Sequence, residues 1–285
     1  ISVGTSIAIA FPRSPMVVAY TSWDLQRLSA GRFELGLGTQ VKGHNERRYS
    51  VKWTPPGPRM REYVRSLTTI WDCWQNDTPL DFEGEHYAFS LMTPEFNPGP
   101  NDHPRPPVYT AAVGPVMCRV AGEVCDGILL HSFTTERYTQ AVILPMVEAG
   151  AKRTGRSVHD LMISGGGFIA TGATDEDVYH ARESARRRMS FYGSTRTYKG
   201  VLDLHEWGDT CTRLHEMSLK GQWDDMPGQI TDTMLDTFCA SGTYDEIGPT
   251  LKERYGPFAS RISLPVPADP RHDDKLGSLI EEVEG

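Results

Sequence analysis

The sequence predicts an α/β fold built on parallel strands, and it favours a (β/α)8 barrel over a doubly wound open sheet. Short apolar segments rich in β-branched residues alternate with longer segments whose apolar residues recur at helical spacing. Helical segments, and no tight turns, join the consecutive strands, and parallel strands need such crossovers. No GxGxxG motif follows the first strand, which disfavours a dinucleotide-binding open sheet. Strands that end in glycine and precede long loops favour a barrel with its site on that face.

The chain opens within a strand of small and β-branched residues, so six strands are expected where a complete barrel has eight. We therefore expect a barrel that lacks its first two strands in this chain. The six expected strands lie near residues 1–9, 32–38, 108–113, 127–131, 161–171 and 261–266. The expected helices lie near residues 15–28, 60–74, 115–124, 135–153, 175–192, 234–239 and from 244 to 255.

Helix signals support several of these assignments. Ser14 followed by Pro15 is a typical helix start, because serine caps the first turn and proline fits its first position. Pro145 predicts a kink in the helix that begins near Thr135. The clearest amphipathic pattern follows Pro58. Its apolar positions are Met60, Tyr63, Val64, Leu67, Ile70, Trp71 and Trp74.

Five segments depart from this alternation. Residues 40–53 form a polar loop, and residues 80–90 predict a small hairpin that turns at a glycine. Six prolines between residues 94 and 107 exclude a helix and predict an extended surface connection. Residues 193–230 keep no strand pattern and predict a helical insertion or lid. We expect one barrel domain over residues 1–266 and a polar, mobile tail over residues 267–285.

Composition excludes several classes of function. The net charge of −8 argues against a nucleic-acid surface, and no apolar run approaches the ~18 residues of a membrane span. No cysteine pair has zinc or redox spacing, so we expect buried thiols in a reducing cytoplasm. His205-Glu206 and His215-Glu216 lack the second histidine of a metalloprotease helix, so no metal is expected. The five cysteines are Cys73, Cys118, Cys125, Cys211 and Cys239.

One βαβ unit, from Pro107 to Ser132, organises the middle of the chain. Its strand-to-helix turn, Ala111 to Pro115, carries no bulky side chain and directs backbone N–H groups outward. Such a turn at a helix N-terminus can hold a phosphate. A glycine is also common in ordinary βα turns, so the turn alone leaves both interpretations open.

Several motifs, taken together and in chain order, resemble the bacterial-luciferase-like family of (β/α)8 barrels. The resemblance runs from Ile1 to about Pro267 and is strongest to the actinobacterial branch of F420-dependent oxidoreductases. The motifs that carry it are Gly4-Thr5-Ser6-Ile7, Asp24 to Phe33 (DLQRLSAGRF), Gly36-Leu37-Gly38-Thr39, Arg61-Glu62-Tyr63, Ala111 to Pro115 (AAVGP), Ala121-Gly122-Glu123 with Asp126-Gly127, and Gly242-Thr243.

The resemblance implies coenzyme F420, or alternatively FMN, across the carboxyl-terminal mouth of the barrel. It places Ser6 and Ile7 at a bulge that often holds a non-prolyl cis peptide behind the cofactor ring. Thr39 and Asn45 match positions near the ring or the ribityl chain. The positions that match the phosphate cradle are Ala112, Val113 and Gly114, with His131 and Ser132 on the next strand beside it.

The catalytic proton donor is not identified by the resemblance. In the family, the two strands that precede this chain carry the acidic and histidine residues nearest the reactive ring atom. His131 at a strand end and His44 in the polar loop are therefore the candidates within this sequence. Glu34 in mid-strand is better explained as a paired charge lining the barrel. Tyr192, Trp207 and Trp223 could either wall a substrate pocket or pack in the core.

These features predict an enzyme that transfers a hydride between F420 and a small organic substrate. FMN-dependent monooxygenation on the same barrel is the alternative, because fold does not decide between the two cofactors. A non-catalytic cofactor-binding relative and a phosphosugar barrel remain further alternatives. The basic residues Lys42, His44, Arg47 and Arg48 favour the anionic tail of F420, although a solvated surface would show the same composition. We expect a cytoplasmic homodimer, as relatives often are dimers.

Overall fold

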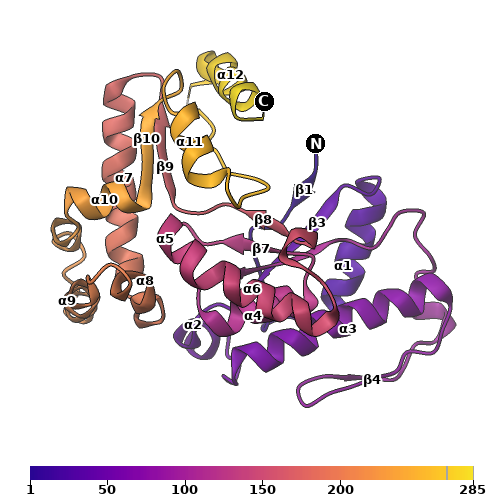
Figure 1. The fold of residues 1–285 in the computed structure, drawn as a ribbon. Helices are drawn as coiled ribbons and strands as arrows, with labels where there is room; N and C mark the ends of the chain where they lie inside the picture. Colours follow the sequence, from indigo (N-terminus) through magenta and orange to yellow (C-terminus); the bar gives the residue numbers. More distant parts are fainter. Residues whose placement is uncertain (268, 285) are drawn as a thin grey trace. The chain divides into compact units, whose positions relative to one another are not determined.

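A computed structural model describes residues 1–267 and 269–284, and the chain forms two compact units (Figure 1). The first unit comprises Ile1–Leu129 and Leu144–Met162, and the second comprises Leu130–Ile143 and Ile163–Gly285. Each unit has its own packed interior. None of the described helices combines the length and the apolar composition that a membrane crossing requires.

A parallel sheet forms the centre of the first unit. Strand β3 (Phe33–Gly38) pairs on one side with β1 (Val3–Gly4) and β2 (Ala8–Ile9), and on the other with β6 (Val108–Ala112). The sheet continues through β7 (Gly127–Leu130) toward the start of β8 (Met162–Ser164). All the registered pairings of β3 are parallel, so the predicted α/β class is confirmed. The absence of two strands and the status of residues 193–230 as an insertion stay predictions.

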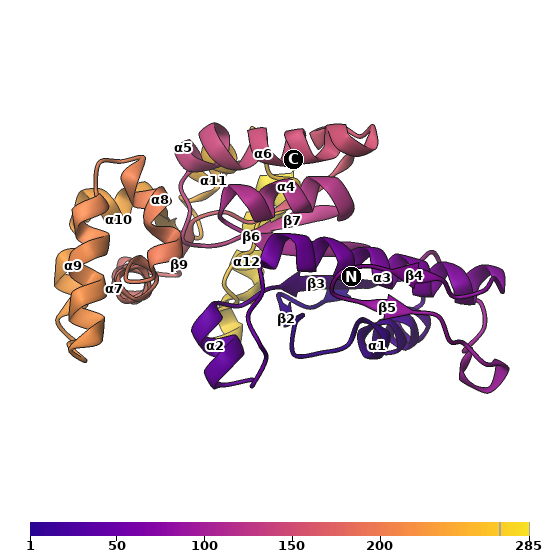
Figure 2. The same ribbon diagram turned by 90° about the horizontal axis from the view of Figure 1, so that it is seen from below.

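Four helices of the first unit pack in succession, α1 on α3, α3 on α4 and α4 on α6 (Figure 2). Two glycines allow α4 and α6 to touch backbone to backbone. A Cβ atom at Gly122 would overlap the carbonyl of Val147, and one at Gly150 would overlap the carbonyl of Arg119. The helices of this unit are α1 (Pro15–Leu28), α2 (Lys42–Arg47), α3 (Pro56–Asn76), α4 (Pro115–Val124) and α6 (Leu144–Ala151).

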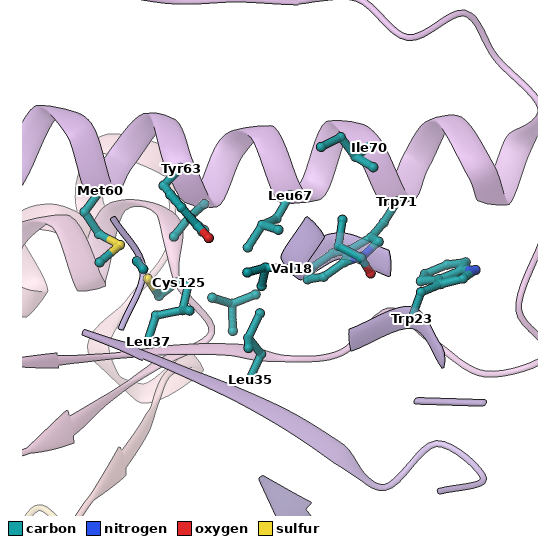
Figure 3. Packing of buried hydrophobic residues seen from close by; sticks show 14 of the residues in the cluster. Val18, Trp23, Leu35, Leu37, Met60, Tyr63, Leu67, Ile70, Trp71 and Cys125 are labelled. Carbon is teal, nitrogen blue, oxygen red and sulfur yellow. The ribbon is translucent and has the colours of Figure 1, made fainter. Parts of the chain in front are cut away.

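The core of the first unit lies between α1, α3 and β3 (Figure 3). Every apolar position predicted for α3 is buried. Trp71 of α3 stacks against Trp23 of α1 with ring centroids 6.5 Å apart, and its indole N–H donates to the Ala19 carbonyl. Burying side chains of this size stabilises the fold by roughly 1.5 to 3 kcal/mol each.

Side chains of α1 hold the proline-rich segment in place. Side chains of α1 donate hydrogen bonds to several backbone carbonyls of this segment. Gln26 Nε2 donates to the Pro104 carbonyl at 2.8 Å, Trp23 Nε1 to Gly99 at 3.1 Å, and the Tyr20 hydroxyl to Phe96. The predicted extended connection is thus ordered by α1. It contains η1 (Pro94–Phe96) and follows the predicted hairpin of β4 (Phe82–Glu83) and β5 (Ala88–Phe89).

A buried carboxylate ties three elements of the first unit together. Glu123 on α4 is only 8% exposed and accepts hydrogen bonds from Arg61 Nε at 2.9 Å, Arg65 Nη2 at 3.2 Å and Arg153 Nη1 at 3.3 Å. Burial alone would raise the pKa of Glu123, but the three guanidinium groups outweigh it and lower the pKa. The carboxylate therefore stays charged and links α3 and α4 to η3 (Lys152–Thr154).

The second unit is built around β9 (Phe168–Gly172) and β10 (Cys239–Thr243), which pair in parallel. Helix α7 (Asp175–Gly193) covers both strands and starts with a capping box between Thr174 and Asp177. The remaining elements are α5 (Glu136–Tyr138), the π-helical turn η2 (Thr139–Ile143), η4 (Val158–Asp160) of the first unit, η5 (Arg196–Tyr198), α8 (Lys199–Asp203), α9 (Gly208–Leu219), η6 (Met226–Gln229), α10 (Asp232–Phe238), α11 (Gly248–Tyr255), η7 (Pro270–His272) and α12 (Asp273–Glu284).

The predicted last strand, residues 261–266, is wrong. Arg261 forms a single bridge with Ser164, and the N–H groups of Ser260 and Arg261 both donate to the Ile163 carbonyl. Pro265 then removes a further ladder donor. A strand that we did not predict, β10, instead pairs with β9. Its sequence, CASGT, has the small residues and glycine that strands usually avoid.

Three further expectations need correction. The polar loop at 40–53 contains a short helix, α2. The strand expected over 161–171 divides at Gly165, Gly166 and Gly167, which all have positive φ, so it becomes β8 and β9. The tail from Pro267 contains a helix that we did not predict, α12, which packs on α11 and buries Leu279. Ala268 and Gly285 of the predicted tail lie outside the described residues.

Candidate functional site

In the first unit, the predicted ring-binding residues Ser6, Ile7 and Thr39 follow the carboxyl ends of β1 and β3, and Asn45 lies on α2. The Ser6–Ile7 peptide bond is cis, as the resemblance implied. The preceding Thr5 hydroxyl both donates to the Gly36 carbonyl at 2.7 Å and accepts from the Gly36 N–H at 3.0 Å. A Cβ at Gly38 would overlap the Ile7 side chain, so glycine at the end of β3 allows Ile7 to lie across it.

Asn45 has a buried side-chain amide whose nitrogen is hydrogen-bonded and whose oxygen is not. Its Nδ2 donates to the Thr39 carbonyl at 2.9 Å and to the Val41 carbonyl at 3.2 Å, which fixes the orientation of the carboxamide. Its Oδ1 is buried and has no hydrogen-bond partner among the described residues. A buried acceptor of this kind ordinarily has a donor. Asn45 Oδ1 thus fits a ligand that presents an N–H group.

The turn after β6 is open. Gly114 caps α4 with an ordinary φ of −77°, and no described atom lies within 4 Å of a Cβ built on it. The glycine is therefore not needed for its backbone conformation, and a Cβ here would meet no described atom beyond its chain neighbours within 4 Å. The N–H groups of the first helical turn, after Pro115, lack intrahelical partners. Together with Ala112 and Val113, this turn could accept a phosphate.

His131 follows β7 in the second unit and lies in an aromatic cluster. Its Nδ1 accepts a hydrogen bond from the Phe133 N–H at 2.9 Å. Its ring meets Tyr192 edge to face at 4.6 Å and Tyr198 at 5.1 Å. Burial lowers the pKa of His131 to about 4, so the imidazole is neutral at physiological pH. Ser132 is the next residue and is half-buried.

The other candidate donor has a different environment. His44 lies on α2 and is exposed, as are Lys42, Arg47 and Arg48 around it. Lys42 forms an exposed ion pair with Glu46 at 3.9 Å, a contact worth about 0 to 1 kcal/mol. Within the first unit, the basic segment is therefore a solvated surface, and His44 lies on it.

The three aromatic residues suggested as a pocket wall occupy separate places. Tyr192 belongs to the cluster around His131. Trp207 stacks on His205 at 4.8 Å, and the His205 Nε2 lies 2.9 Å from the Thr135 hydroxyl. Trp223 is 49% exposed and contacts Phe191. Only Tyr192 therefore accompanies a predicted site residue.

Sequence reasoning missed a group of buried polar atoms in the second unit. Four side chains line one small cavity with Gly166 and Gly167, and none of these four polar atoms has a hydrogen-bond partner among the described residues. The three consecutive glycines were the available signal, since glycine within a strand pattern can mark a close approach. The four atoms are Thr134 Oγ1, Thr139 Oγ1, Arg254 Nη1 and Tyr255 OH.

One group of side chains in the first unit has the spacing of metal ligands. Ligand atoms of Glu62, Glu85 and His86 lie within 4.8 Å of one another. The Glu62 carboxylate, however, accepts the backbone N–H groups of Glu85 at 3.1 Å and His86 at 2.7 Å. These hydrogen bonds hold the hairpin turn against Glu62, which explains why the three side chains lie close together.

Comparison with known proteins assigns this arrangement to a family. The model of the luciferase-like monooxygenases matches residues 1–261. The chain belongs to the luciferase-like monooxygenase family. The predicted resemblance is thereby confirmed, and the parallel α/β sheet is that of a luciferase-like protein.

Two relatives of this luciferase-like protein span most of its length. An uncharacterized protein of Mycobacterium tuberculosis, Rv1360, is 44% identical over 266 residues, which cover 93% of this chain and 78% of the relative. A 5,10-methylenetetrahydromethanopterin reductase of Archaeoglobus fulgidus is 28% identical over 292 residues, covering 99% of this chain and 82% of the reductase. Relatives thus include both an actinobacterial protein without assigned function and a reductase.

Solved structures show the same fold. The coenzyme F420-dependent tetrahydromethanopterin reductase of Methanopyrus kandleri superposes with a TM-score of 0.71 at 18% identity, covering 99% of this chain and 81% of the reductase. EDTA monooxygenase of Chelativorans sp. BNC1 gives a TM-score of 0.70 at 16% identity, covering 99% and 72%. The luciferase-like fold therefore accommodates both a reductase and a monooxygenase.

Proposed function

We propose that this luciferase-like protein is an oxidoreductase that transfers a hydride between coenzyme F420 and a small organic substrate. The observation that carries the proposal is the open turn at Gly114, because both F420 and FMN have a phosphate that such a turn can accept. Structural similarity to a coenzyme F420-dependent reductase over 99% of the chain favours F420. A cytoplasmic homodimer is part of the same proposal and rests on the sequence reasoning.

The residues of the first unit fit a ring cofactor with an anionic chain. Ala112, Val113 and Gly114 would hold the phosphate, and the remaining ring contacts would come from the segments at Ser6–Ile7 and Thr39–Asn45. The unpartnered Asn45 oxygen matches the N–H group of a flavin-type pyrimidine ring. When bound, F420 supplies or accepts a hydride at a ring carbon, and FMN can in addition react with oxygen.

FMN-dependent monooxygenation is the second candidate. It is favoured by the family description and by the structural similarity to EDTA monooxygenase. The open turn serves either cofactor, so it does not distinguish them. The catalytic proton donor stays unassigned. Burial lowers the pKa of His131 and keeps it neutral, and His44 is exposed on α2, so neither residue is assigned this role.

Titration with each cofactor tests the proposal. We expect wild-type protein to bind F420 more tightly than FMN, measured by the absorbance change of the cofactor. Gly114→Val should weaken binding about tenfold or more, since its branched side chain occupies the space where the phosphate would lie. Its φ and ψ are in the extended region that valine prefers, so the fold should be kept.

Gly228→Val is the matched control, because a Cβ there also meets no described atom within 4 Å and lies in the second unit. Equal cofactor affinity of Gly114→Val and Gly228→Val would refute the phosphate assignment. Tight FMN binding with oxygen uptake, and no F420 binding, would select the monooxygenase instead.

A further inference from the structure

His131 has a defined proton position. A ring nitrogen that accepts a hydrogen bond carries no proton, and Nδ1 accepts from the Phe133 backbone N–H at 2.9 Å. A backbone N–H cannot reverse its role, so this contact excludes the tautomer with a proton on Nδ1. In a neutral ring the proton is then on Nε2.

The surroundings of His131 keep the ring neutral. The groups in ring contact with it are Tyr192 on α7 and Tyr198 on η5, and Phe133 contacts both tyrosines. Burial raises the pKa of Tyr198, so this neighbour is also uncharged. Burial is the cause that lowers the pKa of His131. An imidazolium here would lose hydration and, among the described residues, would gain no carboxylate partner.

The Nε2–H group of His131 is open. The structure gives it no hydrogen bond to any of the described residues, although the ring is largely surrounded by protein. Histidines that serve only as core residues ordinarily have both nitrogens satisfied. The residue is of intermediate exposure and is not sealed from solvent. The aromatic rings next to it offer an apolar surface beside one donor, which is the usual make-up of a small-molecule site.

We propose that His131 is held as the neutral Nε2–H tautomer and donates this hydrogen bond to the carbonyl or hydroxyl oxygen of an uncharged substrate. The apolar part of the substrate would pack on Tyr192 and Tyr198. The inference deepens the proposed function and rests on it for the identity of the ligand as a substrate. His131 thereby orients the substrate oxygen and transfers no proton, because Nδ1 is already engaged by the backbone.

The proton position is tested first, without any cofactor. In protein labelled with ¹⁵N in the imidazole rings, the His131 signals should show a protonated Nε2 and a bare Nδ1 and stay unchanged from pH 8 to pH 5. The signals are assigned by their loss in His131→Asn. A proton on Nδ1, or titration of the ring between pH 6 and pH 7, would overturn the proposal.

Binding of two probes tests the donor role. Cyclohexanone offers one uncharged carbonyl, and cyclohexanecarboxylate has a similar size with a negative charge. We expect cyclohexanone to shift the Nε2–H signal of the wild type and to bind about fivefold to tenfold more weakly to His131→Asn. The asparagine side-chain oxygen can still accept the N–H two residues on, so the local turn is kept and only the Nε2 donor is lost.

His131→Gln is the complementary variant. Its amide nitrogen reaches toward the former Nε2 position, so cyclohexanone should bind it more tightly than it binds His131→Asn. Equal affinity of wild type and His131→Asn for cyclohexanone, or tighter binding of the carboxylate than of the ketone, would contradict the proposal. Because these measurements need neither F420 nor FMN, a failure of the cofactor titration alone would refute the proposed function and leave the His131 assignment intact.

Discussion

The two compact units differ in what fills their interiors. The first has one continuous core in which aromatic side chains of α1 and α3 pack on β3. The second has a smaller apolar cluster around Tyr244 and Leu251, together with an aromatic group at His131 and a cavity lined by unpartnered hydroxyls. A continuous apolar core mainly stabilises the fold. Buried side-chain atoms without hydrogen-bond partners occur in both units, for example Asn45 Oδ1 in the first and the Tyr255 hydroxyl in the second. We therefore expect the largest losses of stability from substitutions in the larger core of the first unit.

The largest expected effect is on the core of the first unit. Trp71→Ala should lower the free energy of unfolding by about 3–5 kcal/mol, because it removes a fully buried ring and its hydrogen bond to the Ala19 carbonyl. Urea denaturation followed by far-UV circular dichroism measures this loss. Leu28→Ala is the control, since Leu28 is 81% exposed on the neighbouring α1. A similar loss in both variants would show that the α1–α3 core is not the main source of stability.

The buried Glu123 should give the next largest effect. Glu123→Gln leaves three guanidinium groups without their carboxylate and should cost about 2 kcal/mol at pH 7, less than a fully buried pair because Arg65 and Arg153 are half exposed. Chemical denaturation of the variant beside wild type checks this value. A variant as stable as wild type would mean that the three arginines lie free of Glu123 in solution.

The lowered pKa of Glu123 predicts that the free energy of unfolding depends on pH. Its pKa in the folded protein is below the ordinary value of 4.5, so its stabilising contribution is complete above that value and is lost as the pH falls through the lowered pKa. The stability difference between wild type and Glu123→Gln should therefore shrink as the pH falls from 5 toward 3. A constant difference over this range would contradict the assignment.

The smallest expected effect concerns the second unit. Thr174→Ala removes the capping box of α7 and should cost about 1 kcal/mol. Thr237 provides a comparison, because its hydroxyl only donates back to the Thr233 carbonyl within α10, so Thr237→Ala should change stability by less than about 0.5 kcal/mol. Thermal unfolding midpoints distinguish the two. Equal midpoints would mean that α7 is held by packing and that its cap adds little.

Prediction from sequence succeeded where hydrophobic periodicity was long and regular. The pattern from Met60 to Trp74 extends over several turns, so one face of α3 could be assigned without tertiary information. The second unit lacks such patterns at its strands. Residues 239–243 pair as β10 because β9 offers a parallel partner. Residues 261–266 have a strand-like composition, but their pairing is limited to the single bridge between Arg261 and Ser164. In both segments, pairing with residues distant in sequence determines whether a strand forms. Local composition does not contain this information.

At the candidate site, too, sequence reasoning predicted local features but not those that depend on residues distant in sequence. Motif resemblance located the cis peptide at Ser6–Ile7 and the turn at Gly114. It did not indicate that the imidazole of His131 would be neutral, because this depends on Tyr192 and Tyr198, which lie more than sixty residues further along the chain. It also missed the cavity at Tyr255, since single threonines and tyrosines carry no spacing signal. The roles of the predicted cofactor residues remain predictions.

The glycine contact between α4 and α6 has a consequence for how the protein can be divided. Helix α6 returns to the first unit after the excursion of residues 130–143, and Gly122 and Gly150 bring its main chain directly onto α4. A recombinant fragment ending at Leu129 would leave that face of α4 bare, whereas a genetic fusion that joins residues 1–129 to residues 144–162 through a short linker would cover it. A fragment that represents the first unit should therefore be made by replacing residues 130–143 with a linker. Truncation at Leu129 would not give the same unit, because it removes α6.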